Sequence, residues 1–69
     1  MKSQEYLKSI AIEDLQAWDV RLGNVSRELS YQLQLMQSGQ PLREMVASAY
    51  GKAMAVGAAI EEEINERNT

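Results

Sequence analysis

Two apolar stripes with helical spacing, joined at Gln37-Ser38-Gly39-Gln40-Pro41, restrict this chain to a small set of folds. On the N-terminal side, apolar residues recur in alternating steps of three and four from Leu15 to Met36. On the C-terminal side, the same spacing extends from Leu42 to Ile64. Steps of three and four place side chains on one face of an α-helix, so the sequence predicts two long helices.

The residues between the stripes are suited to a tight helical turn. Gly39 fits the left-handed position that follows a helix, and Pro41 fits the first turn of the next helix. A short connection favours antiparallel neighbours. We therefore predict an all-α antiparallel hairpin, with a first helix over about residues 4–37, a turn at 38–40 and a second helix over about 41–66.

The whole chain, residues 1–69, is predicted to form one helical-hairpin domain. Residues 3–11 either continue the first helix or form a short separate helical turn, because Ser9 could cap a break there. A chain this short and without disulfides needs idealised packing or association to be stable. We expect self-association or a partner to complete the hairpin into a helical bundle.

The two main stripes are expected to pack against each other as the hairpin core. Trp18 is the largest side chain on them, and Gln32 is the one polar interruption in the first. The predicted core consists of Leu15, Trp18, Leu22, Val25, Leu29, Leu33, Met36, Leu42, Met45, Ala49, Ala53 and Ile64.

The second helix has more apolar surface than one neighbour can cover, since residues 53–60 contain no polar side chain. Such a segment is normally buried on several sides, although alanine also serves as a good helix former on a surface. Small residues spaced by four would allow a second helix to approach closely. The predicted interface on the second helix is Ala47, Gly51, Met54, Ala55, Val56, Ala59 and Ile60, joined from the first helix by Tyr31 and Leu35.

All nine of these predicted interface positions are uncharged.

Composition argues against several classes of function. The chain has no Cys and no His, which removes disulfides, the usual zinc and haem ligands and the commonest nucleophile and base. The formal net charge of −3 and the scattered basic residues make a nucleic-acid-binding surface unlikely to form. We expect no enzyme activity, no catalytic residue, no cofactor, no metal, no membrane span and no small-molecule substrate. With no signal peptide visible, we expect a cytoplasmic protein.

An acidic cluster, Glu61-Glu62-Glu63 with Glu66, lies near the end of the second helix. That end has the negative pole of the helix dipole, so the cluster is locally unfavourable. In a hairpin it would lie beside the start of the first helix, with Lys2 and Lys8 nearby. The cluster is either solvated helix-end charge or a docking site for a basic partner.

The segment Leu35-Met36-Gln37-Ser38-Gly39, followed by Lys52-Ala53-Met54 and Ala59-Ile60, resembles the small E-type co-chaperones of type III secretion needle subunits. These are short helical hairpins with a glycine in the turn and an alanine-rich second helix. The resemblance covers roughly residues 30–64. It implies that Ala53, Val56 and Ile60 face a helical-repeat chaperone, and that the pair keeps a polymerising subunit soluble.

We therefore expect a small adaptor or co-chaperone that binds a helical partner through its alanine-rich second helix. One alternative is an inhibitor of the kind that phages and mobile elements encode, which binds and blocks a host protein. A further alternative is a homodimeric four-helix bundle with a regulatory role. Helical spacing alone does not separate these three hypotheses.

Overall fold

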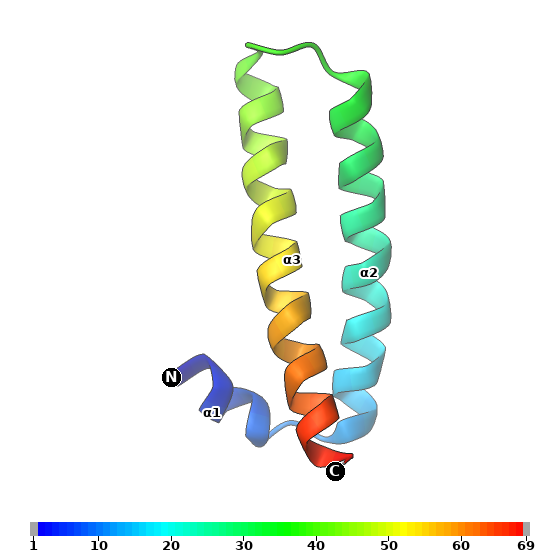
Figure 1. Ribbon diagram of the computed structural model, residues 1–69, viewed down its shortest axis with the longest axis vertical. Helices are drawn as coiled ribbons and strands as arrows, with labels where there is room; N and C mark the ends of the chain where they lie inside the picture. The colour runs from blue at the N-terminus through cyan, green and yellow to red at the C-terminus, as the bar shows by residue number, and fades with distance from the viewer. Residues whose placement is uncertain (1, 69) are drawn as a thin grey trace.

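The computed structural model describes the backbone of residues 2–68 and the side chains of residues 5–68. It contains three helices in this range: α1 (Lys2–Lys8), α2 (Ile12–Leu35) and α3 (Pro41–Arg67). The two long helices form the predicted antiparallel hairpin, and α1 lies at the end opposite the turn, beside the C-terminal end of α3 (Figure 1). The molecule is elongated, measuring 43 × 22 × 16 Å.

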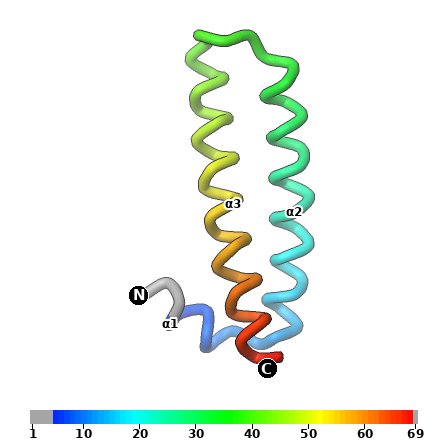
Figure 2. The backbone as a smooth tube through the Cα atoms, viewed as in Figure 1, coloured from blue at the N-terminus to red at the C-terminus, as the bar shows by residue number. Residues whose placement is uncertain are grey.

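A break at residues 9–11 separates α1 from α2, so a continuous first helix from residue 4 is wrong and the alternative of a short separate segment is right. Ser9 Oγ donates a 2.7 Å hydrogen bond to the carbonyl of Tyr6. Ser9 therefore provides a hydrogen bond to a carbonyl in the last turn of α1. The N-cap of α2 is Ala11, which makes no side-chain hydrogen bond. The tube trace in Figure 2 shows how the chain turns sharply here.

The turn between the long helices has the predicted chemistry in a slightly longer connection. α2 ends at Leu35, two residues before the predicted end, because Met36 leaves helical geometry with φ −93° and ψ 142°. Gly39 has φ +88°, the left-handed conformation expected of it. Pro41 begins α3, where a missing N–H leaves no helical hydrogen bond unmade.

The hairpin is held by two seams, the rows of buried or half-buried residues that face each other. Each seam follows alternating steps of three and four along its helix, the spacing of coiled-coil packing. Leu15 and Ile60 are the apolar side chains that become fully buried among the described residues, at 1% and 4% exposure. The α2 seam is Ile12, Leu15, Asp19, Leu22, Ser26, Leu29, Leu33 and Met36, and the α3 seam is Arg43, Val46, Tyr50, Ala53, Gly57, Ile60, Ile64 and Arg67.

Seven of the predicted core residues belong to these seams, and five do not. Trp18 and Val25 are exposed by 51% and 46%, because α2 turns Asp19 and Ser26 toward α3 in their place. In the half of α3 nearer the turn, Arg43, Val46 and Tyr50 likewise face α2, each one residue after the predicted position. The core residues that the structure places on the surface are Trp18, Val25, Leu42, Met45 and Ala49.

The positive φ of Gly39 generates a prediction with an internal control. Gly39→Ala should lower the free energy of unfolding by about 1 kcal/mol or more, because a Cβ disfavours this backbone conformation. Gly23→Ala should raise it by up to about 1 kcal/mol, since Gly23 lies inside α2 with open space around an added Cβ. Chemical denaturation monitored by circular dichroism measures both. Equal effects of the two substitutions would contradict the assigned turn geometry.

Candidate interaction surface

One side of the hairpin collects large apolar side chains that neither helix covers. On α2, Trp18 and Val25 immediately precede the seam residues Asp19 and Ser26. Each of these two seam residues is followed by the next seam residue three positions later. On α3, Leu42 and Val56 likewise precede seam residues of this kind. Rotation about a two-fold axis normal to the plane of two antiparallel helices exchanges the two helices, and each side of the pair still faces the same way. Equivalent positions on the two helices therefore lie on the same side of the hairpin.

Two more exposed apolar residues lie on the outer edge of this side. Met45 lies one helical turn beyond Leu42, and Leu35 lies one turn beyond Gln32, so both extend the outer edge. Six of the ten large apolar residues with high exposure thus share one side of the molecule. We call this set the apolar flank: Trp18, Val25, Leu35, Leu42, Met45 and Val56.

The opposite side of the hairpin has mostly small side chains where the helices adjoin, with Met54 as a large exposed apolar residue. A shallow groove there is lined by Gly23 and Ser26 from α2 and by Met54, Ala58 and Glu61 from α3. The lining of the groove shows which residues of the two helices lie next to each other on this side. The apolar flank is therefore on the opposite side of the hairpin. Most of the large exposed apolar side chains therefore lie on one side of the hairpin.

Charged side chains border the apolar flank on its α2 edge. The Arg21 guanidinium lies 5.4 Å from the centroid of the Trp18 ring, a cation–π arrangement. About two turns further on, Glu28 accepts a 2.9 Å hydrogen bond from the Gln32 amide. The α2 edge therefore presents a positive group and a negative group, seven residues apart, beside the exposed tryptophan.

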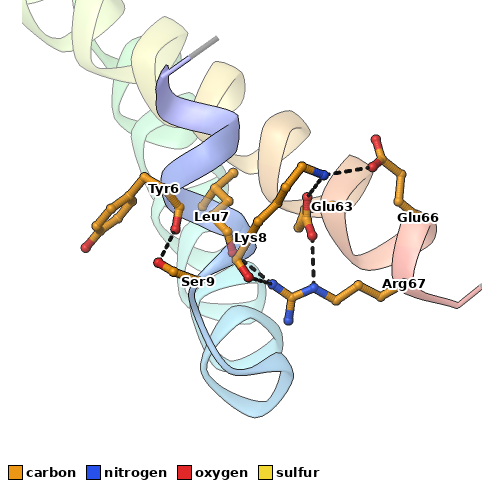
Figure 3. A network of polar contacts seen from close by, with 7 residues as sticks. All are labelled: Tyr6, Leu7, Lys8, Ser9, Glu63, Glu66 and Arg67. Carbon is orange, nitrogen blue, oxygen red and sulfur yellow. Dashed lines mark hydrogen bonds and ion pairs between the residues drawn. The ribbon is translucent and has the colours of Figure 1, made fainter.

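A second group of polar residues fastens α1 to the end of α3 (Figure 3). Arg67 donates hydrogen bonds of 2.8 Å and 3.2 Å to the carbonyls of Leu7 and Lys8. These carbonyls belong to the last turn of α1, where the regular helical hydrogen bonds end. The same guanidinium donates a 2.9 Å bond to Glu63, which is 6% exposed. Arg67 thus links α1 to α3 directly.

Glu63 and Lys8 complete this attachment. Lys8 Nζ lies 3.4 Å from carboxylate oxygens of both Glu63 and Glu66. The hydrogen bond from Arg67, with added attraction from Lys8, lowers the pKa of the Glu63 carboxyl below its usual 4.5. The hydrogen bond to Glu66, together with the charge of Glu63, raises the pKa of Lys8 above its usual 10.5.

The structure changes the interpretation of the acidic cluster. Glu63 is buried and paired with Lys8 and Arg67, so it is neither solvated nor free to meet a basic partner. Glu66 also pairs with Lys8. The side chain of Lys2, expected nearby, lies outside the described residues. Sequence reasoning missed Arg67, whose only signal was a basic residue in the last turn of α3.

The predicted interface residues are scattered around α3 rather than gathered on one face. Ile60 is wrong as an interface residue because it is 4% exposed and packs in the seam. Ala59 is half-buried and shares a pocket with Lys8 of α1. Met54 lines the groove on the side opposite the apolar flank, and Tyr31 lines a neighbouring pocket on that same side. The remaining exposed positions are Ala47, Gly51, Ala55, Val56 and Leu35, of which Val56 and Leu35 belong to the apolar flank.

The residues singled out by the family resemblance divide in the same way. Ala53 and Ile60 belong to the α3 seam, where they face α2 and are unavailable to a chaperone. Val56 remains exposed by 49% on the apolar flank. The surface available to a partner is therefore shared by both long helices and is not the alanine-rich face of α3 alone.

Comparison with protein-family models, curated proteins and solved structures finds no match to this chain. Among the described residues, no helix combines the length and the apolar character needed to cross a membrane. The same residues contain no group of three or more acidic side chains placed to hold a metal ion.

The Glu63 attachment predicts a pH dependence. Because the folded-state pKa of Glu63 is lowered, its contribution to stability is present above about pH 4.5 and is lost as the pH falls through the lowered value. Glu63→Gln should therefore flatten the fall in thermal midpoint between pH 6 and pH 3, as followed by circular dichroism. Glu62→Gln, next along the exposed surface, is the control and should keep the wild-type profile. Identical profiles for all three proteins would contradict this role of Glu63.

Proposed function

We propose that this chain is a small non-enzymatic interaction module that binds a helical protein partner through its apolar flank. The single observation that supports the proposal is the gathering of six large exposed apolar side chains on one side of the hairpin. Contiguous apolar surface of this kind is characteristic of protein–protein interaction sites. The proposal moves the binding surface from the alanine-rich second helix to a surface shared by α2 and α3.

The spacing of the flank favours a helical partner. Trp18 and Val25 are seven residues apart on α2, and Leu42 lies two such intervals from Val56 on α3, with Ala49 between them. Repeats of seven form straight rows along the helices. A helix that lies along such rows buries one apolar face along its length. Trp18 provides a large side chain at the end of the flank farther from the turn, and tryptophan is a residue that often dominates binding energy.

Within this proposal the chain acts as an adaptor or co-chaperone, the role that the resemblance to needle-subunit co-chaperones implies. Val56 supports this form, because it is the partner-facing residue of that resemblance that remains exposed. An inhibitor that blocks a host protein would use the same surface. The identity of the bound protein separates the two roles.

A photo-crosslinking experiment in the native cell tests the surface. A photoreactive amino acid replaces Val25 on the apolar flank in one variant and Val20 in the control, since Val20 is exposed by 65% on the same helix outside the flank. We expect a discrete protein adduct from position 25, and a much weaker one from position 20. Mass spectrometry then identifies the second protein in the adduct.

Two results would contradict the proposed function. One is the absence of any protein adduct from position 25 at native expression, with position 42 in the flank equally silent. The other is equal adducts from positions 20 and 25, which would show that binding does not distinguish the flank from the rest of α2.

A further inference from the structure

We infer that the helical partner on the apolar flank is a second copy of this chain, packed in the opposite direction to form a four-helix bundle. This inference rests on the proposed function, because it names the occupant of the same surface. Three observations point to it: the area that the chain leaves exposed, the symmetry of the apolar rows and the arrangement of charge at their edges.

The exposed area corresponds to one missing interface. A compact monomer of 7.8 kDa is expected to expose about 4,400 Å² of accessible surface. This chain exposes 5266 Å², so it leaves about 900 Å² more than a compact fold of its mass. A standard interface buries about 800 Å² on each partner. The excess is therefore of the size that one specific interface would remove.

The spacing of the rows is symmetric about Val25 and Ala49, since Trp18 and Gln32 flank Val25 by seven residues and Leu42 and Val56 flank Ala49 by seven. The groove shared by Leu22, Gly23, Ala53 and Met54 shows which levels of the two helices adjoin. Counted from there, Val25 and Ala49 lie at nearly the same level, in the middle of the hairpin. A two-fold axis through this level is the symmetry element of a self-complementary dimer.

Rotation about this axis places each row against the same row of the second copy, running in the opposite direction. Val25 meets Val25 of the second copy, and Trp18 meets Gln32 of the second copy. On the other helix, Ala49 meets Ala49 and Val56 meets Leu42. The shorter side chains of Val25 and Ala49 thus occupy the centre, and each longer side chain is paired with a different residue on either side of it.

The charges at the edge select this direction of packing. With α2 antiparallel to α2 of the second copy, Arg21 lies within one residue of the level of Glu28 of that copy, and each dimer contains this pair twice. The parallel alternative would place α2 against α3 of the second copy. It would then bring Arg21 near the level of Lys52, which is a repulsive arrangement.

The position of α1 is compatible with the antiparallel dimer. α1 is fastened beside Ala59, Glu63 and Glu66, at the end of the hairpin opposite the turn. In the antiparallel arrangement, that part of α3 extends past the turn of the second copy. The attachment of α1 therefore leaves the central part of the flank open to a second copy.

A charge exchange on the purified full chain tests the arrangement. Sedimentation equilibrium should give a wild-type mass of twice the 7.8 kDa chain, dissociating on dilution. Arg21→Glu and Glu28→Arg should each raise the dimer dissociation constant about tenfold, because each converts two attractive pairs into repulsive ones. The double variant R21E/E28R should return to within about threefold of wild type, because the pairs are restored with their signs exchanged.

Two further variants connect the dimer to the flank. Val25→Glu places a carboxylate on the symmetry axis and should give a monomer, whereas Val20→Glu, outside the flank, should leave the dimer unchanged. Circular dichroism on every sample verifies that the helices are retained. If Val25→Glu unfolds, the charge exchange still decides the question, because Arg21 and Glu28 are on the exposed surface.

Either of two results would overturn the inference. A wild-type chain that is monomeric throughout the micromolar range has no second copy on its flank. A double variant no tighter than its two parents excludes the antiparallel register. In both cases, a photo-adduct between position 25 and a different protein would leave the proposed function intact, so the two failures are distinguishable.

Discussion

Each long helix has an apolar arc that is wider than the contact its single neighbour can make, and the organisation of this molecule follows from that mismatch. Two antiparallel helices can bury only one narrow stripe apiece. Here the stripes in contact include Asp19, Ser26 and Gly57, while Trp18 and Val56 remain outside. The hairpin is thus formed with part of its apolar surface unused, and that surface defines the flank.

The division between seam and flank explains the small core of the isolated chain. Leu15 and Ile60 are buried near the end of the hairpin at which α1 and Arg67 add further contacts. Toward the turn, seam residues such as Tyr50 and Arg43 stay half-exposed, and the Nε atom of Arg43 has no hydrogen-bond partner. A partner on the flank would bury apolar side chains that the single chain leaves exposed. Association would therefore stabilise the folded chain.

The sequence allowed the helical hairpin, the left-handed Gly39 and the role of Pro41 to be predicted, because these depend on local spacing and turn chemistry. It did not allow the contact stripe to be chosen. The predicted stripe and the α2 seam share Leu15, Leu22 and Leu29, but Asp19 and Ser26 meet α3 in place of Trp18 and Val25. Adjacent residues lie about 100° apart around a helix, so a wide apolar arc can include both. When the apolar arc spans both, hydrophobicity alone does not say which one meets the neighbour.

The attachment of α1 was hidden for a different reason. It joins Arg67 to the carbonyls of Leu7 and Lys8, nearly sixty positions away, and a basic residue in a last helical turn usually needs no partner beyond the helix itself. The position of Ser9 indicated a break, but not that its hydroxyl would serve the preceding helix. Long-range polar contacts of this kind depend on the tertiary arrangement, which local patterns do not specify.

The most direct test of the central claim uses the one tryptophan of the chain, which lies on the apolar flank and needs no substitution. Fluorescence of Trp18 is recorded with acrylamide as quencher over the concentration range in which the sedimentation mass changes. If a second copy covers the flank, the emission shifts to shorter wavelength and the quenching constant falls as the dimer forms. A dimer in which Trp18 remains as accessible to acrylamide as in the monomer would contradict the account, because association would then use another surface.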